Sequence, residues 1–401
     1  MGKVPNLSNA VIDEKSTTWL EDIYKKIHRH PELGMQEFQT TVLIKSIMDD
    51  LGVERIDLPG MDVGAACVIR GGKNGPTLAL RADMDALPIL EKTSLEYASE
   101  NTGIMHACGH DFNTTVMLGV LKKTVEKYSN GNLRGNLKFI FQPAEETLEG
   151  AKRMIEAGIL DNPGVDMIMM SHGDPDINVG QIALFKGYSH ANSDNFSIEL
   201  TGSGGHGSRP FQTQDLILAG SHLVSILQSI VSRDIDARDP AVISVCSFNA
   251  GNTFNVLPGS AKLTGTVRTL SDTVQSRIIQ RMQETCDSLS SLFHIEAKLD
   301  YRVGVPSCVI DDDVEKLIRD AALRHLPEES IISSPTRMGG EDFAFYSRRV
   351  PAGVVRIGVT SVGSRKRGST HSSTFQVDLA AIPVGVTVLS QVVDDFLSSE
   401  E

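Results

Sequence analysis

The sequence has few cysteines, few aromatic residues and no long apolar run, and these shortages exclude several classes of protein. Its 5 cysteines are scattered over 401 residues, which is unlike a disulfide framework and favours a reducing compartment. No run of about 18 apolar residues occurs, so we expect no membrane partner. The start of the chain, "MGKVPNLSNAVIDEKSTTW", lacks the apolar segment of a secretion signal. We therefore expect a cytoplasmic protein.

Basic residues are also scarce. The 38 Lys and Arg are outnumbered by 51 Asp and Glu, which gives a formal net charge of -13. A nucleic-acid partner needs a basic footprint, and the largest basic cluster, "SRKRG" at 364–368, reads as a solvated loop. We expect no nucleic acid and a small-molecule substrate instead. The length predicts more than one domain.

The first half of the chain alternates helical and strand-like patterns. Residues 17–28 and 36–50 have helical periodicity. Strand-like runs follow at "AACVIR", "TLALRADM", "LKFIFQ" and "VDMIMMSH", with helical segments near 111–128 and 148–158. Such alternation is typical of an α/β domain with a mixed, largely parallel sheet and flanking helices.

The pattern changes near residue 188. Between there and residue 303 the order is strand, helix, two strands, helix and strand, which is the plan of a ferredoxin-like α+β domain. After it the α/β pattern returns. We therefore predict a catalytic domain in two segments, 1–187 and 304–401, interrupted by an inserted domain at 188–303 that serves as a lid and dimerisation domain.

Side chains that bind metals recur where predicted strands end and helices begin. They are Asp83, Asp85, Cys108, His110, Glu145, Glu146 and His172. Ligands bind at the carboxyl ends of the strands in an open α/β sheet, so we expect these side chains at one edge. Each one alone is also compatible with a helix cap or a buried thiol. Together, thiolate, imidazole and carboxylate suit Zn or Mn, and their number exceeds the needs of one ion, which favours two.

Ordered motifs then place the chain in a family. "IHRHPELGMQE", "LRADMDALPI", "MHACGHD", "FQPAEE", "GGHGSRP", "FNVLPGSAKLTGTVRT", "MGGEDFAFY" and "HSSTFQVD" follow one another between residue 28 and about 385. The sequence resembles the amidohydrolase branch of the aminoacylase-like dinuclear metallopeptidases. That branch includes N-acyl-amino-acid amidohydrolases, hippurate hydrolases and indole-acetyl-amino-acid hydrolases.

The resemblance implies a role for individual residues. It implies a ligand set for two divalent ions, Mn or Zn, made of Cys108, His110, Glu146, His172 and His371. His371 enters only through the resemblance, because nothing in its local pattern singles it out. Glu145 is implied as the general base that takes a proton from water.

The remaining implied residues surround the metal ligands or lie in the inserted domain. The resemblance implies that His206 donates a hydrogen bond to the oxyanion, in cis or from a partner subunit of a homodimer or higher homo-oligomer formed through the inserted domain. Otherwise it is an exposed histidine of a Gly-rich hairpin. Asn255 and Arg268 are candidates for binding a substrate carboxylate. Asp83 either orients the ligands or only pairs with Arg81.

The function implied is metal-dependent hydrolysis of the amide bond of an N-acyl amino acid or similar small conjugate, releasing acid and amine. One alternative is a related metallo-aminohydrolase that cleaves a different C–N bond, such as that of an aromatic amine. The other is a non-catalytic metal-binding relative. An intact Glu145 argues against the second alternative, because a metal binder has no use for a base beside its ions.

Overall fold

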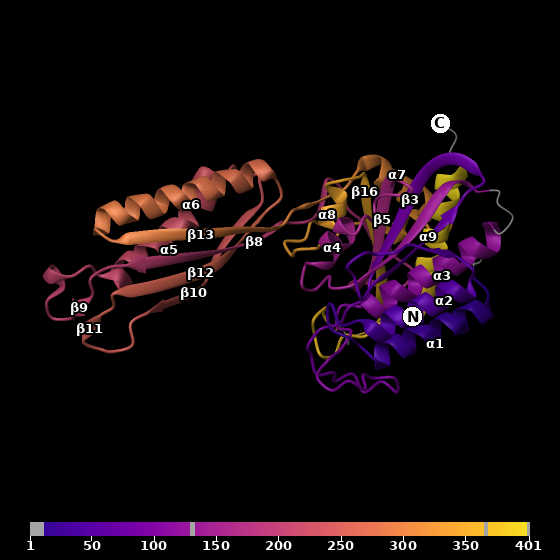
Figure 1. Cartoon of the computed structure of the whole chain (residues 1–401), viewed down its shortest axis with the longest axis horizontal. Coiled ribbons are helices and arrows are strands. Elements are labelled where there is room, and N and C mark those ends of the chain that lie inside the picture. The colour runs from indigo at the N-terminus through magenta and orange to yellow at the C-terminus, as the bar shows by residue number, and fades with distance from the viewer. Residues whose placement is uncertain (1–11, 129–132, 365–367, 399–401) are drawn as a thin grey trace. The chain divides into compact units, whose positions relative to one another are not determined.

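The computed structural model describes residues 12–128, 133–364 and 368–398, and the chain divides into two compact units (Figure 1). The first unit comprises Met1–Ser189, Val309–Pro335 and Phe345–Glu401, and the second comprises His190–Cys308 with Thr336–Ala344. The second unit is therefore inserted into the chain of the first. The first residues of the chain and most of "SRKRG" lie outside the described residues.

The first unit is built on a mixed sheet of eight strands. They are β1 (Glu54–Arg55), β2 (Ala65–Arg70), β3 (Lys73–Asp83), β4 (Arg134–Gln142), β5 (Met167–Asn178), β6 (Ile182–Leu184), β15 (Ile331–Ser333) and β16 (Ala352–Thr360). Their order across the sheet is β1-β2-β4-β3-β5-β16-β6-β15. The central strands β4, β3, β5 and β16 are parallel, whereas the β1–β2, β2–β4 and β16–β6 pairs are antiparallel. The predicted mixed, largely parallel sheet is confirmed.

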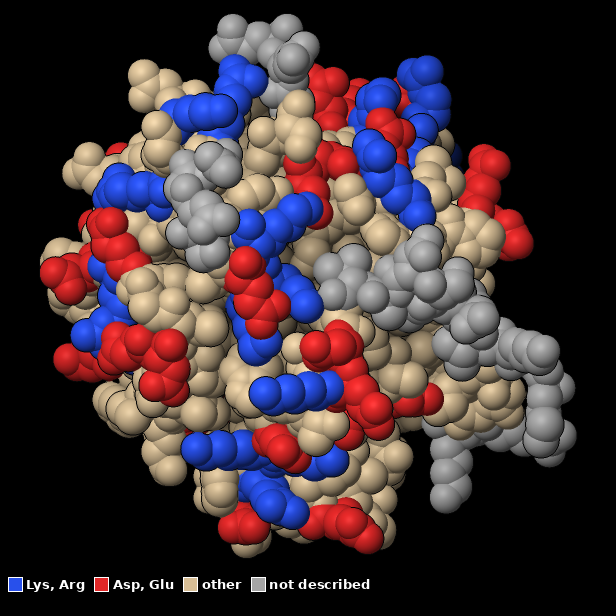
Figure 2. Space-filling model, turned by 90° about the vertical axis from the view of Figure 1, so that its right-hand side faces the viewer, with Lys and Arg blue, Asp and Glu red and all other residues tan. Residues whose placement is uncertain are grey.

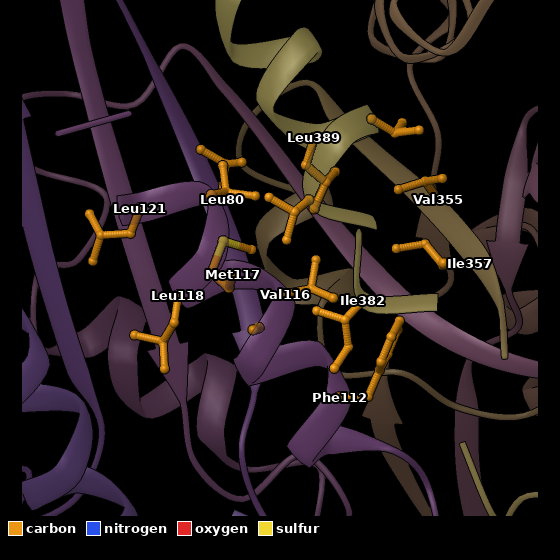
Figure 3. Close-up of a cluster of buried hydrophobic side chains, with 14 of the residues drawn as sticks. Leu80, Phe112, Val116, Met117, Leu118, Leu121, Val355, Ile357, Ile382 and Leu389 are labelled. Atoms are coloured by element: carbon orange, nitrogen blue, oxygen red, sulfur yellow. The ribbon is translucent and has the colours of Figure 1, made fainter. Parts of the chain in front are cut away.

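Helices flank this sheet. They are α1 (Glu14–Arg29), α2 (Phe38–Asp50), α3 (His110–Tyr128), α4 (Gly150–Glu156), α7 (Asp312–Leu323), the short α8 (Ala344–Ser347) and α9 (Ala381–Ser398). Apolar side chains of α3 meet those of α9 and β16 in the core, where Phe112 and Val116 lie beside Ile382 and Ile357 (Figure 3). This packing fixes the first turn of α3, which carries His110.

The second unit has the strand and helix order that the sequence predicts. It runs β8 (Ser193–Thr201), α5 (Leu216–Asp234), β10 (Ala241–Ala250), β12 (Ser260–Thr269), α6 (Asp272–Phe293) and β13 (Glu296–Val305). The antiparallel sheet has the order β10-β12-β8-β13, which is that of a ferredoxin-like fold. Apolar residues alternate along β8, and those on its buried face pack against α5 and α6.

Short elements complete the two units. The strands β9 (Gly205–His206) and β11 (Val256–Leu257) form an antiparallel pair in the second unit. The others are β7 (Tyr188–His190), β14 (Cys308–Val309) and the 3-10 turns Pro210–Gln212 and Glu328–Ser330.

Two described helices, α5 and α9, are long and apolar enough in composition to cross a membrane. In α9, 72% of the apolar window is buried, so it is a core helix. Only 33% of the window of α5 is buried, and its buried side packs on the sheet of the second unit. Two such helices are weak support for a membrane protein. The face in Figure 2 carries Lys and Arg interspersed with Asp and Glu, without one continuous basic area.

One detail of the sequence prediction is wrong. His172 was expected to end its strand, but β5 continues to Asn178. The reason is that β16 pairs with β5 beyond this point, with Ile357 opposite Gly173 and Gly358 opposite Asp174. His172 therefore projects from within a central strand, where it pairs with Arg356 of β16.

Candidate metal centre

A tight turn at the start of α3 presents Cys108 and His110. Gly109 between them has φ +87°, a left-handed conformation that glycine adopts without strain. His110 is fully buried, and its Nδ1 lies 2.9 Å from the backbone oxygen of Asp85. With Nδ1 donating to this oxygen, Nε2 is left to face the other polar side chains.

The turn after β4 presents Glu145 and Glu146. It is closed by Leu148, whose N–H donates to the Glu145 carbonyl at 2.7 Å. A side chain at Gly150 would place its Cβ 1.6 Å from the Pro143 oxygen, so only glycine fits there. Glu145 is buried and Glu146 is half-buried, so the turn carries two adjacent carboxylates in different surroundings.

The remaining two histidines reach the same place from β5 and from the C-terminal segment. The Nδ1 of His172 donates to the Gly173 oxygen at 2.7 Å, and its Nε2 lies 3.6 Å from the Cys108 sulfur. His371 has φ +63°, and its N–H donates to the Ala107 oxygen at 2.7 Å. Its Nε2 lies 3.3 Å from Oε1 of Glu146.

These side chains converge in overlapping sets, two of which share Cys108. One consists of Cys108, His110 and His172, and the other of Cys108, Glu146 and His371, with the ligand atoms of each set within 4.8 Å of one another. His110 Nε2 is buried and makes no hydrogen bond to any described residue, and the buried Glu146 Oε1 has only the 3.3 Å approach of His371 Nε2. Buried polar atoms normally have a partner, and a cation between them would be one. The donor types fit divalent ions such as Zn or Mn, and their number would suit two.

The charges of the site also suit cations. Burial alone would lower the pKa of His110, but the negative charges of Asp83 and Cys108 raise it well above its ordinary value. Hydrogen bonding to Cys108 and Glu146 raises the pKa of His371 to about 10. Burial and the neighbouring Arg356 lower the pKa of His172. A divalent ion would displace the protons that this anionic cluster otherwise draws to His110 and His371.

Two aspartates at the end of β3, Asp83 and Asp85, lie beside the converging side chains. Asp83 accepts hydrogen bonds from Arg81 at 2.7 Å and Asn113 at 2.7 Å, and its Oδ2 is 3.8 Å from His110 Nε2. Asp83 thus both pairs with Arg81 and faces a ligand atom. Asp85 touches two parts of the site, because Oδ1 lies 3.1 Å from His110 Nδ1 and Oδ2 accepts the Glu146 N–H at 3.0 Å. The sequence motif contained Asp85, but its double contact depends on the fold.

The other predicted site residues belong to the second unit. His206 and Asn255 lie together on the β9–β11 pair, where the Gly207 N–H donates to the Asn255 oxygen at 2.9 Å. Both side chains are exposed. Arg268 lies near the opposite end of β12, eight residues beyond the start of that strand at Ser260, or roughly 26 Å along it. The structure therefore does not bring Arg268 close to the β9–β11 pair that carries His206.

A buried histidine outside the ligand set ties α1 to the start of α3. The Nδ1 of His28 lies 2.6 Å from Asp111 Oδ2, and its Nε2 lies 3.2 Å from Glu91 Oε1. Burial alone would lower the pKa of His28, but hydrogen bonding to Asp111 and Glu91 raises it to about 9. A charged imidazole between two carboxylates therefore braces the helix that carries His110.

Comparison with known proteins gives the site its context. The sequence model of peptidase family M20/M25/M40 matches residues 79–395. The chain is 36% identical to an N-acetyl-L-cysteine deacetylase of Bacillus subtilis, over 94% of this chain and 88% of the relative. It is 33% identical to the IAA-amino acid hydrolase ILR1-like 4 of Arabidopsis thaliana, over 94% of this chain and 86% of the relative.

A solved structure agrees with these relatives. A dinuclear metal-binding peptidase of the M20 family from Bacillus subtilis is 32% identical, with a TM-score of 0.83 over 95% of this chain and 98% of that one. The dinuclear centre of that protein supports a centre with two metal ions here. With a family match across most of the sequence and relatives aligned along nearly their whole length, the chain belongs to peptidase family M20/M25/M40.

Proposed function

We propose that the protein hydrolyses the amide bond of an N-acyl amino acid or a similar small conjugate, releasing an acid and an amine. The single observation that carries the proposal is the position of Glu145. This buried carboxylate lies beside the converging ligand side chains, with Oε2 4.0 Å from His110 Nε2. The names of the deacetylase and amino-acid-conjugate hydrolase relatives support the same substrate class.

The five side chains Cys108, His110, Glu146, His172 and His371 are the proposed ligands of two divalent ions, Mn or Zn. When bound, such ions polarise the substrate carbonyl and make a water molecule more acidic. Asp83 and Asp85 hold His110 and the Glu146 backbone in place, as outer residues of metal sites commonly do.

Glu145 performs the proton transfers in this proposal. It takes a proton from the attacking water as the new C–O bond forms, and it returns that proton to the nitrogen as the C–N bond breaks. His206 donates to the oxyanion, from the same chain or from a partner in a homodimer or higher homo-oligomer formed through the inserted unit. Asn255 is proposed to bind the substrate carboxylate. Arg268 remains a second candidate, since its Nη1 is buried without a hydrogen bond to a described residue.

The test is Glu145→Gln, which keeps the shape of the side chain and removes the base. We expect the variant to hold as many metal ions as the wild type, measured by elemental analysis. Its kcat should fall by about 10²–10⁴-fold, because that is the usual contribution of general acid–base catalysis. A variant with nearly full activity would refute the proposed role of Glu145.

The substrate class is tested by amine release from N-acyl amino acids, dipeptides and aryl amines, with Mn-loaded and chelator-treated enzyme. Metal-dependent release from the acyl amino acids supports the proposal. Release from aryl amines alone favours the related hydrolase of a different C–N bond. We also propose a cytoplasmic location, in keeping with the scattered cysteines.

A further inference from the structure

A carboxylate far from the ligands in sequence contacts the turn that carries them. Glu37 is fully buried, and its Oε1 accepts the N–H of Ala144 at 2.8 Å. Ala144 directly precedes Glu145 and Glu146. The segment before Glu37 packs closely against the same turn. A Cβ at Gly34 would lie only 3.2 Å from the Ala144 Cα.

The position of Glu37 is that of a helix cap, yet its side chain does not cap the helix. Glu37 is the N-cap residue of α2, and its side chain makes no capping hydrogen bond. Glu32 performs that task instead, since its carboxylate accepts the N–H of Gln39 at 3.0 Å and of Thr40 at 2.9 Å. Glu37 is thereby left to bind the Ala144 amide.

The turn needs such support because its backbone is strained. Ala144 has φ +55° and Leu148 has φ +59°, in a region that residues with a Cβ rarely adopt. Such a conformation is costly and persists only where its surroundings hold it. The Ala144 carbonyl is engaged on the other side, accepting the N–H groups of Glu149 and Gly150 at 3.3 and 3.2 Å. Glu37 fixes the remaining polar group of this residue.

We propose that Glu37 is a positioning residue for the Glu145–Glu146 turn, which it holds through the Ala144 amide in the conformation that places both carboxylates beside His110. The inference rests on the proposed function in that Glu145 is the base. The contact itself is independent of that role. Glu37 does not touch the substrate or the reacting atoms. Burial and the nearby charge of Asp85 raise the pKa of Glu37 to about 7, so a neutral side chain is compatible with this task.

The experiment compares Glu37→Ala, Glu37→Gln and Glu32→Ala in the full-length protein. The glutamine variant keeps a carbonyl oxygen that accepts the Ala144 N–H. Glu32→Ala is the matched control, because it removes a carboxylate with two amide contacts from the same segment and leaves the turn untouched. Each variant is studied at a temperature where circular dichroism shows it to be folded.

We expect Glu37→Ala to lower kcat about 10²-fold, since a small misplacement of a catalytic group has effects of this size, and to leave KM within about threefold. Glu37→Gln should restore kcat to within about threefold of wild type, and Glu32→Ala should lower thermal stability with kcat retained. Equal kcat losses in Glu37→Ala and Glu32→Ala would overturn the proposal, as would a glutamine variant as impaired as the alanine variant.

Amide hydrogen exchange of the peptide covering 143–150 gives a readout that needs no activity. Exchange should accelerate in Glu37→Ala and stay at the wild-type rate in Glu37→Gln and Glu32→Ala. If the wild type proves inactive on every amide, the proposed function fails while this exchange pattern still tests the contact. Unchanged exchange in Glu37→Ala would overturn the inference even in an active enzyme.

Discussion

Raising the pH from about 6 to about 9.5 should remove stability that His28 supplies. Its folded pKa of about 9 lies above the ordinary 6.5, because Asp111 and Glu91 favour the charged ring despite its burial. A raised pKa means that the folded state binds the proton more tightly than the unfolded state. The contribution is therefore complete below about pH 6.5 and is lost as the pH rises through about 9.

The size of the effect follows from the shift. A rise of the pKa from 6.5 to about 9 corresponds to about 3 kcal/mol of unfolding free energy at low pH, nearly all of it lost by about pH 9.5. The side chain of His28 is only 2% exposed, so solvent does little to weaken the interaction. Glu91 contributes to stability in a separate pH range. Hydrogen bonding to His28 lowers the pKa of Glu91 to about 2 despite its burial, so this contribution is lost only in acid.

The assay is urea unfolding from about pH 6 to 9.5, comparing the wild type with His28→Gln. The chain has 1 tryptophan, Trp19, which lies on α1 against the core of the first unit, so its fluorescence reports on this unit. The free-energy difference between the two proteins should shrink by about 3 kcal/mol over this range. His222→Gln, which removes an exposed imidazole from the second unit, is the control. A difference that stays constant with pH would refute the argument.

Two further predictions concern the metal centre and its turn. Cys108→Ala should lower the occupancy of both ions, whereas His371→Ala should affect mainly one, because Cys108 belongs to two of the clusters and His371 to one. Elemental analysis after dialysis checks this, and selective loss of one ion in Cys108→Ala would contradict it. Gly150→Ala should destabilise the first unit by about 3 kcal/mol or more, since the new Cβ would overlap the Pro143 oxygen. The control is Gly164→Ala, because nothing lies within 4 Å of the position of its Cβ. Similar urea midpoints for the two variants would count against the clash.

Regular patterns in the sequence predicted most of the fold. Strand–helix alternation predicted the sheet of the first unit, and the order of elements predicted the ferredoxin-like second unit. Both depend on local periodicity, which the sequence displays directly. The extent of β5 beyond His172 was not predictable in this way, because it depends on pairing with β16, which lies about 180 residues later in the chain.

The site was less accessible to local patterns. Cys108, His110, Glu145 and Glu146 stood out because metal-type residues are adjacent there. His371 required a family resemblance, since a loop residue with φ +63° has no periodic signal. Glu37 and Ala144 are 107 residues apart in the chain. Their contact joins a carboxylate to a backbone amide, and because every residue except proline has such an amide, the residue type at position 144 does not reveal it. The double contact of Asp85 is hidden for the same reason.

The place of β16 in the sheet has a consequence for biosynthesis. This strand lies between β5 and β6, yet it is made after the whole inserted unit, and His371 follows it. A nascent chain that ends before residue 352 leaves the main-chain groups of β5 that face β16 without their partner strand. The second unit has its own hydrophobic core, and domains generally fold as units, so its folding does not depend on β16. The proposed ligand set can therefore be complete only after residue 371 has been made, near the end of translation.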